Sequence, residues 1–162
     1  MAIDYRRKAR TVALQVLYEV DCTGHDVQVT LGRALHEAAL PEEAVQLATQ
    51  IAVGVAEKRA SLDEVIVRHA PQWPVDELSV VDRNVFRIAI YEISFNNETT
   101  FKVVINEAVE LAKAFGSLNI YRFINGVLGS VVEDAVTNLG AVPGSGNKQG
   151  SLIPGGSSGD RI

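Results

Sequence analysis

Residues 79–95 read SVVDRNVFRIAIYEISF, and this stretch decides the fold class. Ser79 followed three residues later by Asp82 is typical of a helix N-terminus, and Asn96-Asn97 is typical of a helix end. At about 100° per residue, the apolar side chains lie on three sides of this helix: Val81, Val85 and Ile88; Phe86, Ala89 and Ile93; Val80, Tyr91 and Phe95. Because a helix that is apolar over most of its circumference is usually the central one of a bundle, the stretch predicts a buried helix in an all-α fold.

The sequence after this stretch predicts two further helices. Residues 101–115 place their apolar side chains on one face, and Gly116 is predicted to close that helix as a C-terminal cap. The last helix covers roughly 118–139 and contains Gly126 and Gly129, each of which costs ~1 kcal/mol of helix propensity. That cost predicts that another backbone approaches the last helix closely at Gly126.

The sequence before residue 79 predicts four helices. The first starts after Asp4 and ends at Gly24, because its apolar residues recur with helical spacing. The other three are placed by their end signals: Asp26 as an N-cap with an end at Ala39, Pro41 in a first turn with an end at about Arg59, and a capping box at Ser61 with an end before Pro71. The stretch PQWP at 71–74 is a rigid break between two helical halves.

Length and composition fit one compact domain. The chain has 162 residues, of which 47% are hydrophobic and 22% charged, enough for one core and too few for two ordinary domains. We therefore expect about seven helices in a single domain over 1–139, built from two small bundles at about 4–70 and 75–139. Residues 140–162 are rich in Gly and Ser and cannot bury enough apolar area to offset their ordering entropy, which predicts a disordered, flexible tail.

Several function classes find no support in the sequence. No apolar run approaches the ~20 residues that span a bilayer, and no signal-peptide core follows the N-terminus, so we expect a cytoplasmic protein with no membrane partner. The three histidines are scattered and Cys22 is the only cysteine, so no metal site and no cofactor are expected. Glu107 and Glu110 share a helix face, but a solvated polar face explains them better than acid/base chemistry. We expect no enzymatic activity.

Charge points to a polyanionic partner at the N-terminus. The net charge is −5, yet residues 1–10 carry four cations against Asp4. On the first helix Arg7, Gln15 and Tyr18 fall on the side opposite the apolar stripe. Cations for phosphates, an amide for a base edge and an aromatic ring for stacking suit single-stranded RNA. Two plainer readings stay open, namely a solvated basic end and a Tyr18 ring that covers the core.

Four blocks of the sequence resemble one known family. They are RRKAR at 6–10 with Gln15 and Tyr18 behind it, RIAIYE at 87–92, INEAVELAK at 105–113 and FINGVL at 123–128. In this order and spacing they resemble the bacterial NusB family of transcription antitermination factors over about residues 4–139. The resemblance implies an all-helical fold of two small bundles and a non-catalytic role.

The resemblance also implies partners and site residues. Family members pair with NusE, a small-subunit ribosomal protein, and the heterodimer binds the boxA element of nascent RNA. This antitermination complex helps RNA polymerase read through terminators, notably in ribosomal RNA operons. The positions that would bind RNA here are Arg6, Arg7, Lys8, Arg10, Gln15, Tyr18, Asn119, Arg122 and Phe123. The partner surface would lie around Glu77, Asp82 and Tyr91. The free chain would be a monomer or a weak homodimer.

Two alternatives remain at this point. A related helical domain precedes the catalytic part of some ribosomal RNA cytosine methyltransferases, although this chain contains no cofactor-binding sheet. A helical protein-interaction module is the other reading. Salt-dependent RNA affinity would separate RNA binding from a pure interaction module.

Overall fold

The computed structural model describes residues 2–96 and 98–139, and the predicted tail at 140–162 lies outside these described residues. The described part contains seven α-helices and one short 3-10 helix, which confirms the all-α prediction. Their bounds are α1 Ala2–Thr23, α2 Val27–Ala38, α3 Glu42–Glu57, α4 Arg59–His69, η1 Val75–Glu77, α5 Val80–Phe95, α6 Phe101–Phe115 and α7 Tyr121–Leu139. None of these helices combines the length and the apolar character needed to cross a membrane.

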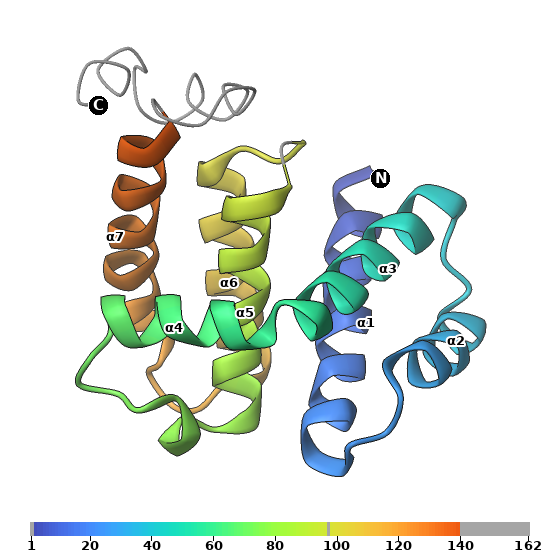
Figure 1. The fold of residues 1–162 in the computed structure, drawn as a ribbon. Helices are drawn as coiled ribbons and strands as arrows, with labels where there is room; N and C mark the ends of the chain where they lie inside the picture. The colour runs from blue at the N-terminus through green and yellow to red at the C-terminus, as the bar shows by residue number, and fades with distance from the viewer. Residues whose placement is uncertain (1, 97, 140–162) are drawn as a thin grey trace.

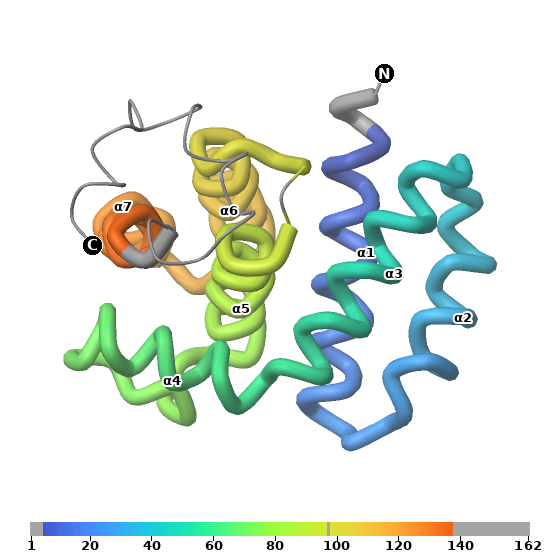
Figure 2. The backbone as a smooth tube through the Cα atoms, turned by 45° about the horizontal axis from the view of Figure 1, so that its top comes forward, coloured from blue at the N-terminus to red at the C-terminus, as the bar shows by residue number. Residues whose placement is uncertain are grey.

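The helices form two groups that share one hydrophobic core (Figures 1 and 2). Helices α1, α2 and α3 pack on one another, and α4, α5, α6 and α7 form the second group. Helix α5 of the second group joins the two, because it contacts α1 and α3 of the first group as well as α4, α6 and α7. The N-terminus of α1 and the C-terminal end of α7 lie at the same end of the molecule, and the α6–α7 connection lies at the opposite end (Figure 1).

The second group starts at Arg59, earlier than the boundary predicted from the PQWP break. Ser61 does not cap a helix, because its hydroxyl donates to the carbonyl of Lys58 at 3.0 Å and lies inside α4. Only Lys58 separates α3 from α4, and α4 then turns its buried Leu62 and Ile66 toward the second group. His69 at the end of α4 lies 2.7 Å from the Ser130 hydroxyl of α7 through its Nδ1 atom.

Most helix ends lie where the sequence predicts them. Asp26 and Ser79 act as N-caps by accepting hydrogen bonds from backbone N–H groups three residues on, both at 3.0 Å. Gly24 has φ +77, the left-handed conformation that a glycine adopts without strain at a helix end. Pro41 differs slightly, since it is the N-cap residue of α3 and not part of its first turn.

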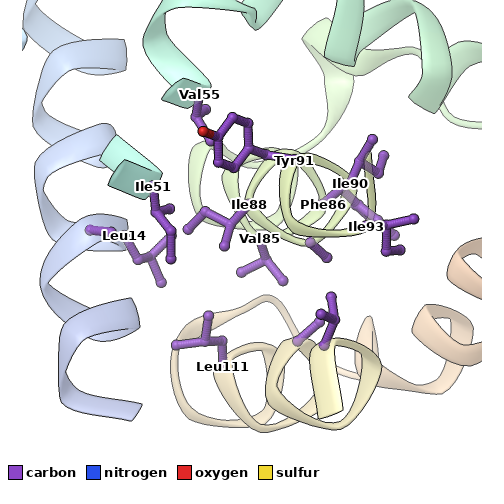
Figure 3. Packing of buried hydrophobic residues seen from close by; sticks show 14 of the residues in the cluster. Leu14, Ile51, Val55, Val85, Phe86, Ile88, Ile90, Tyr91, Ile93 and Leu111 are labelled. Atoms are coloured by element: carbon purple, nitrogen blue, oxygen red, sulfur yellow. The ribbon is translucent and has the colours of Figure 1, made fainter. Parts of the chain in front are cut away.

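Helix α5 is the central helix, as its sequence predicts. From Asp82 to Ile93 every residue except Arg83 is buried. Figure 3 shows the α5 side chains surrounded by Leu14 of α1, Ile51 and Val55 of α3 and Leu111 of α6. The apolar residues from Val85 to Ile93 therefore bury their surface on all sides, which is the main source of stability for a bundle of this size, whereas Phe95 at the end of α5 is 46% exposed.

The close-approach prediction for Gly126 is wrong, and another glycine has that role. A Cβ added at Gly126 or Gly129 would meet nothing within 4 Å, because both positions of α7 face open space. A Cβ at Gly54 of α3 would overlap the Tyr91 ring of α5. Tyr91 is 7% exposed, so its ring has little room to move away. The close approach of helices at a glycine is therefore between α3 and α5. The helix propensity of glycine alone does not show which helical glycine lies against a neighbouring helix.

We expect Gly54→Ala and Gly126→Ala to change stability in opposite directions. The Cβ at residue 54 forces the buried Tyr91 ring to shift, which costs about 1–3 kcal/mol of the free energy of unfolding. The same substitution at residue 126 gains up to about 1 kcal/mol of helix propensity without a clash. Urea unfolding of both variants measures the difference. Equal stability of the two variants would contradict the α3–α5 contact.

Candidate nucleic-acid interface

The four N-terminal cations of α1 divide into three environments. Arg6 and Lys8 are exposed. The Arg7 side chain is 48% exposed, and its guanidinium donates two hydrogen bonds to the Glu107 carboxylate of α6, at 3.0 and 2.8 Å. Arg6, Arg7 and Lys8 thus present charge at the surface, with Arg7 fixed in direction by α6.

Arg10 lies inside the protein, which corrects its predicted role in RNA binding. Its side chain is 2% exposed, and its Nε and one terminal nitrogen donate to the two carboxylate oxygens of Glu92, both at 2.8 Å. Glu92 on α5 is 1% exposed. Arg10 follows the basic run in sequence but turns toward the core, so it holds α1 against α5 and has no surface from which to reach a phosphate.

A groove follows the cations along α1. It has a volume of about 330 Å³ and lies where α1, the start of α5 and the end of α6 meet. Its lining residues are Thr11, Leu14, Gln15, Tyr18, Val81 and Phe115. Tyr18 and Phe115 are 46% and 49% exposed, so aromatic surface is open to solvent on both sides of the groove. Gln15 and Tyr18 therefore share the face that helical spacing predicts, and the half-exposed Tyr18 ring lies beside Leu14 in the groove.

The turn between α6 and α7 directly follows Phe115 of the groove and is held by Asp82. The buried Asp82 carboxylate accepts hydrogen bonds from the backbone N–H of Ser117, at 3.0 Å, and from its hydroxyl. Gly116 passes so close that an added Cβ would lie 2.8 Å from Asp82 Oδ1. With φ −80 and ψ 177, Gly116 ends α6 in an extended conformation and not in the left-handed one of a glycine cap, and the site has no space for a side chain.

The residues predicted at the start of the last helix lie around this turn. Asn119 is in the turn, with φ +70, and its carbonyl accepts a hydrogen bond from the N–H of Arg122 at 3.1 Å. Arg122 is exposed and Phe123 is 47% exposed, both in the first turn of α7. Leu118, in the turn between α6 and α7, is 89% exposed. Polar, cationic and aromatic side chains thus gather at one end of α7.

The three predicted partner residues do not share a surface. Glu77 is exposed in η1, whereas Asp82 is 3% exposed and belongs to the support of the α6–α7 turn. The Tyr91 ring is packed against Gly54, and burial raises the pKa of its hydroxyl. Asp82 and Tyr91 are therefore corrected from partner contacts to structural residues, and only Glu77 is available to a partner.

Comparison with known families assigns the chain to one of them. Residues 7–133 match the model of the NusB family. The chain belongs to the NusB family. It is 50% identical to the transcription antitermination protein NusB of Dehalococcoides mccartyi (strain CBDB1) over 78% of this chain and 88% of that protein. It is 45% identical to the same protein of Roseiflexus castenholzii over 78% of this chain and 91% of the relative.

Solved NusB structures share the fold. T. maritima NusB superposes with a TM-score of 0.74 at 32% identity, over 80% of this chain and 91% of that one. A second structure, of the antitermination factors NusB and NusE in complex with dsRNA, gives a TM-score of 0.73 at 25% identity, over 81% and 98%. The resemblance inferred from sequence is confirmed, and the chain is a transcription antitermination protein of a non-catalytic family.

Sequence reasoning about this NusB chain missed two aromatic residues at the candidate interface. Helical spacing assigns Phe115 to the apolar face of its helix, but it is the last residue of α6 and is 49% exposed. The PQWP stretch predicts only a rigid break around Trp73, yet the Trp73 ring contacts Phe123. Position at a helix end could have flagged Phe115, whereas nothing in the sequence joins Trp73 to Phe123.

Proposed function

We propose that this protein binds single-stranded RNA of the boxA type, together with a NusE partner, as part of an RNA polymerase antitermination complex in the cytoplasm. The observation that carries the proposal is the order of features along α1, in which the exposed Arg6 and Lys8 precede the groove beside Tyr18, and the groove residue Phe115 leads directly into the α6–α7 turn. Residues 6 and 18 are 12 residues apart on one helix, which separates them by about 18 Å. Phosphate contacts therefore lie at one end and aromatic surface at the other.

The groove favours unpaired bases as the ligand. Tyr18 and Phe115 offer aromatic faces, and the Gln15 amide can both donate and accept hydrogen bonds at a base edge. Bases inside a duplex are stacked on one another and cannot enter such a groove, whereas single-stranded bases can. The related NusB–NusE structure was solved with dsRNA, so the strand state of the RNA is a point that the experiment must test.

The charge of the body supports a basic protein partner. Residues 11–139 carry a net charge of −9, while residues 1–10 carry +3. An acidic body attracts a basic protein such as a ribosomal protein and keeps RNA on the basic side of α1. The NusB of the related structure is in complex with NusE, and its chain is covered over 98% of its length by the match. We therefore propose NusE as the partner here.

We expect Arg6→Gln with Lys8→Gln to weaken binding of single-stranded RNA by roughly tenfold to a hundredfold in 50 mM salt. Each lost phosphate contact should also reduce the slope of log affinity against log salt by about 0.7. Fluorescence anisotropy with a labelled boxA-type RNA, with and without NusE, measures both quantities. The loss should be nearly equal for RNAs of different sequence, because phosphates carry no sequence information.

A matched control removes the same charge elsewhere. Lys58→Gln with Arg68→Gln takes two cations from the junction of α3 and α4 and from the exposed side of α4, and should leave RNA affinity within about twofold. Equal losses in the two variants would mean that only net charge matters. No RNA affinity in either the free or the NusE-bound protein would favour a protein-interaction module, and tighter binding to a duplex of the same sequence would contradict the single-strand proposal.

A further inference from the structure

Trp73 supports the exposed aromatic ring at the end of the proposed RNA surface. The ring centroids of Trp73 and Phe123 are 4.8 Å apart at an interplanar angle of 80°, an edge-to-face contact. Trp73 packs against the hydrophobic core, and its backbone N–H donates to the Ala70 carbonyl at 3.0 Å. Phe123 is half exposed, so one part of its ring faces Trp73 and another faces solvent.

This contact matters because a half-exposed side chain in a first helical turn can change rotamer. An edge-to-face pair contributes about 0.5–1.5 kcal/mol beyond the buried area and so favours one orientation of the ring. A ring that is already oriented loses less conformational freedom when a ligand stacks on it. Trp73 thus prepares Phe123 for contact without needing to touch the ligand itself.

Charge around the pair indicates the side on which RNA would lie. Arg122 precedes Phe123 and is exposed. Asp76 and Glu77 follow Trp73 in η1 and are both exposed and acidic. Phosphates are attracted to the cation that precedes Phe123 and repelled by the acidic residues that follow Trp73. The charges therefore favour an RNA strand that reaches Phe123 and stops before Trp73.

We propose that Trp73 is a positioning residue, which holds the Phe123 ring in the orientation in which an unpaired RNA base stacks on it. This inference rests on the proposed function. It assigns to the 71–74 segment a part in RNA binding that acts entirely through α7.

The test is a double-mutant cycle on RNA affinity. We expect Trp73→Ala to weaken binding of single-stranded RNA about three- to tenfold, and Trp73→Phe to restore it to within about twofold, since a phenyl ring can also make an edge-to-face contact. In a Phe123→Ala background the Trp73→Ala change should have no further effect. Trp73→Leu keeps apolar volume but has no aromatic ring, so it should lose the same RNA affinity as Trp73→Ala. It replaces the alanine variant in the cycle if thermal unfolding shows that Trp73→Ala is unstable.

Fluorescence gives a second measurement, because Trp73 is the single tryptophan of the chain. Excitation at the red edge of indole absorption reports on Trp73 alone. RNA that stacks on Phe123 should alter the emission of Trp73 in the wild type but not in Phe123→Ala. Equal losses from Trp73→Ala in both backgrounds would overturn the proposal, as would an emission change caused by NusE without RNA. If Phe123→Ala itself binds RNA normally, the proposed RNA surface is wrong at this end.

Discussion

Glu92→Gln is expected to lower the free energy of unfolding by about 3–5 kcal/mol, as measured by urea denaturation. The substitution keeps the shape of the side chain but removes the charge opposite Arg10. Arg10 is 2% exposed, so its guanidinium would remain inside the protein without the carboxylate that accepts two of its hydrogen bonds, and only the charge of Glu107 would act on it from nearby. An uncompensated buried charge is among the most destabilising changes that a single substitution can make.

The matched control is Glu107→Gln, which makes the same chemical change in the neighbouring pair. Its partner Arg7 is 48% exposed and can be solvated by water, so the expected loss is about 1 kcal/mol or less. The double variant Arg10→Met with Glu92→Leu should recover most of the stability, since two apolar side chains replace the pair. A loss of equal size in Glu92→Gln and Glu107→Gln would contradict the buried position of Arg10.

The same double variant separates structure from function at the N-terminus. If Arg10 only holds α1 against α5, Arg10→Met with Glu92→Leu should bind RNA with the wild-type salt dependence. Arg6 and Lys8 then account for the phosphate contacts of this segment. A smaller slope of log RNA affinity against log salt in the double variant would show that Arg10 does contact a phosphate.

Helix periodicity and capping residues predicted most of the helices, because both depend only on residues that are close together in the sequence. The apolar circumference of residues 80–95 predicted the central helix, and the side chains of Asp26 and Ser79 cap their helices as their types suggest. Such signals depend on spacing within one helix, which the sequence contains in full. The start of α4 was misplaced because Ser61 can bond to a carbonyl within its own helix as well as cap a new one.

The site was harder to predict because several of its residues are defined by contacts between distant helices. Arg10 stood in a basic run, yet on α1 it lines up with Leu14 and Leu17 on the buried side. Glu92 is the matching carboxylate within an otherwise apolar stretch of α5. Each is a lone charge on an apolar helix face, which is a usable signal for a buried pair. Asp82 gives no comparable signal, since its partners are the backbone N–H and the hydroxyl of Ser117, in a turn 35 residues away.

Asp21 at the end of α1 is the centre of a second buried network. Its side chain is 3% exposed and accepts hydrogen bonds from Arg83, Arg87 and Asn84 of α5, at 2.9 to 3.0 Å. Arg59 of α4 lies 3.3 Å away. Burial alone would raise the pKa of Asp21, but the hydrogen bonds from Arg83 and Asn84 and the charges of Arg87 and Arg59 outweigh it and hold the pKa well below its usual range. One carboxylate therefore joins α1, α4 and α5.

We expect Asp21→Asn to lower the free energy of unfolding by about 3 kcal/mol at neutral pH, because it leaves Arg83 without this counter-charge in a site of low exposure. The loss should lie at the lower end for a buried pair, since Arg87 keeps its two hydrogen bonds to Asp63, at 2.7 and 2.9 Å. Urea unfolding of the wild type and the variant at several pH values measures it.

The pH dependence of that difference has a definite sign. The carboxyl pKa is lower in the folded chain than in the unfolded chain, so the unfolded state binds the proton first as the pH falls. The stabilisation by Asp21 is therefore fully present above its ordinary pKa of 3.8 and is lost progressively below it. The gap between wild type and Asp21→Asn should stay constant from about pH 8 to pH 5 and narrow below about pH 4. A gap that persists unchanged at pH 3 would show that the carboxylate charge does not hold the three helices together.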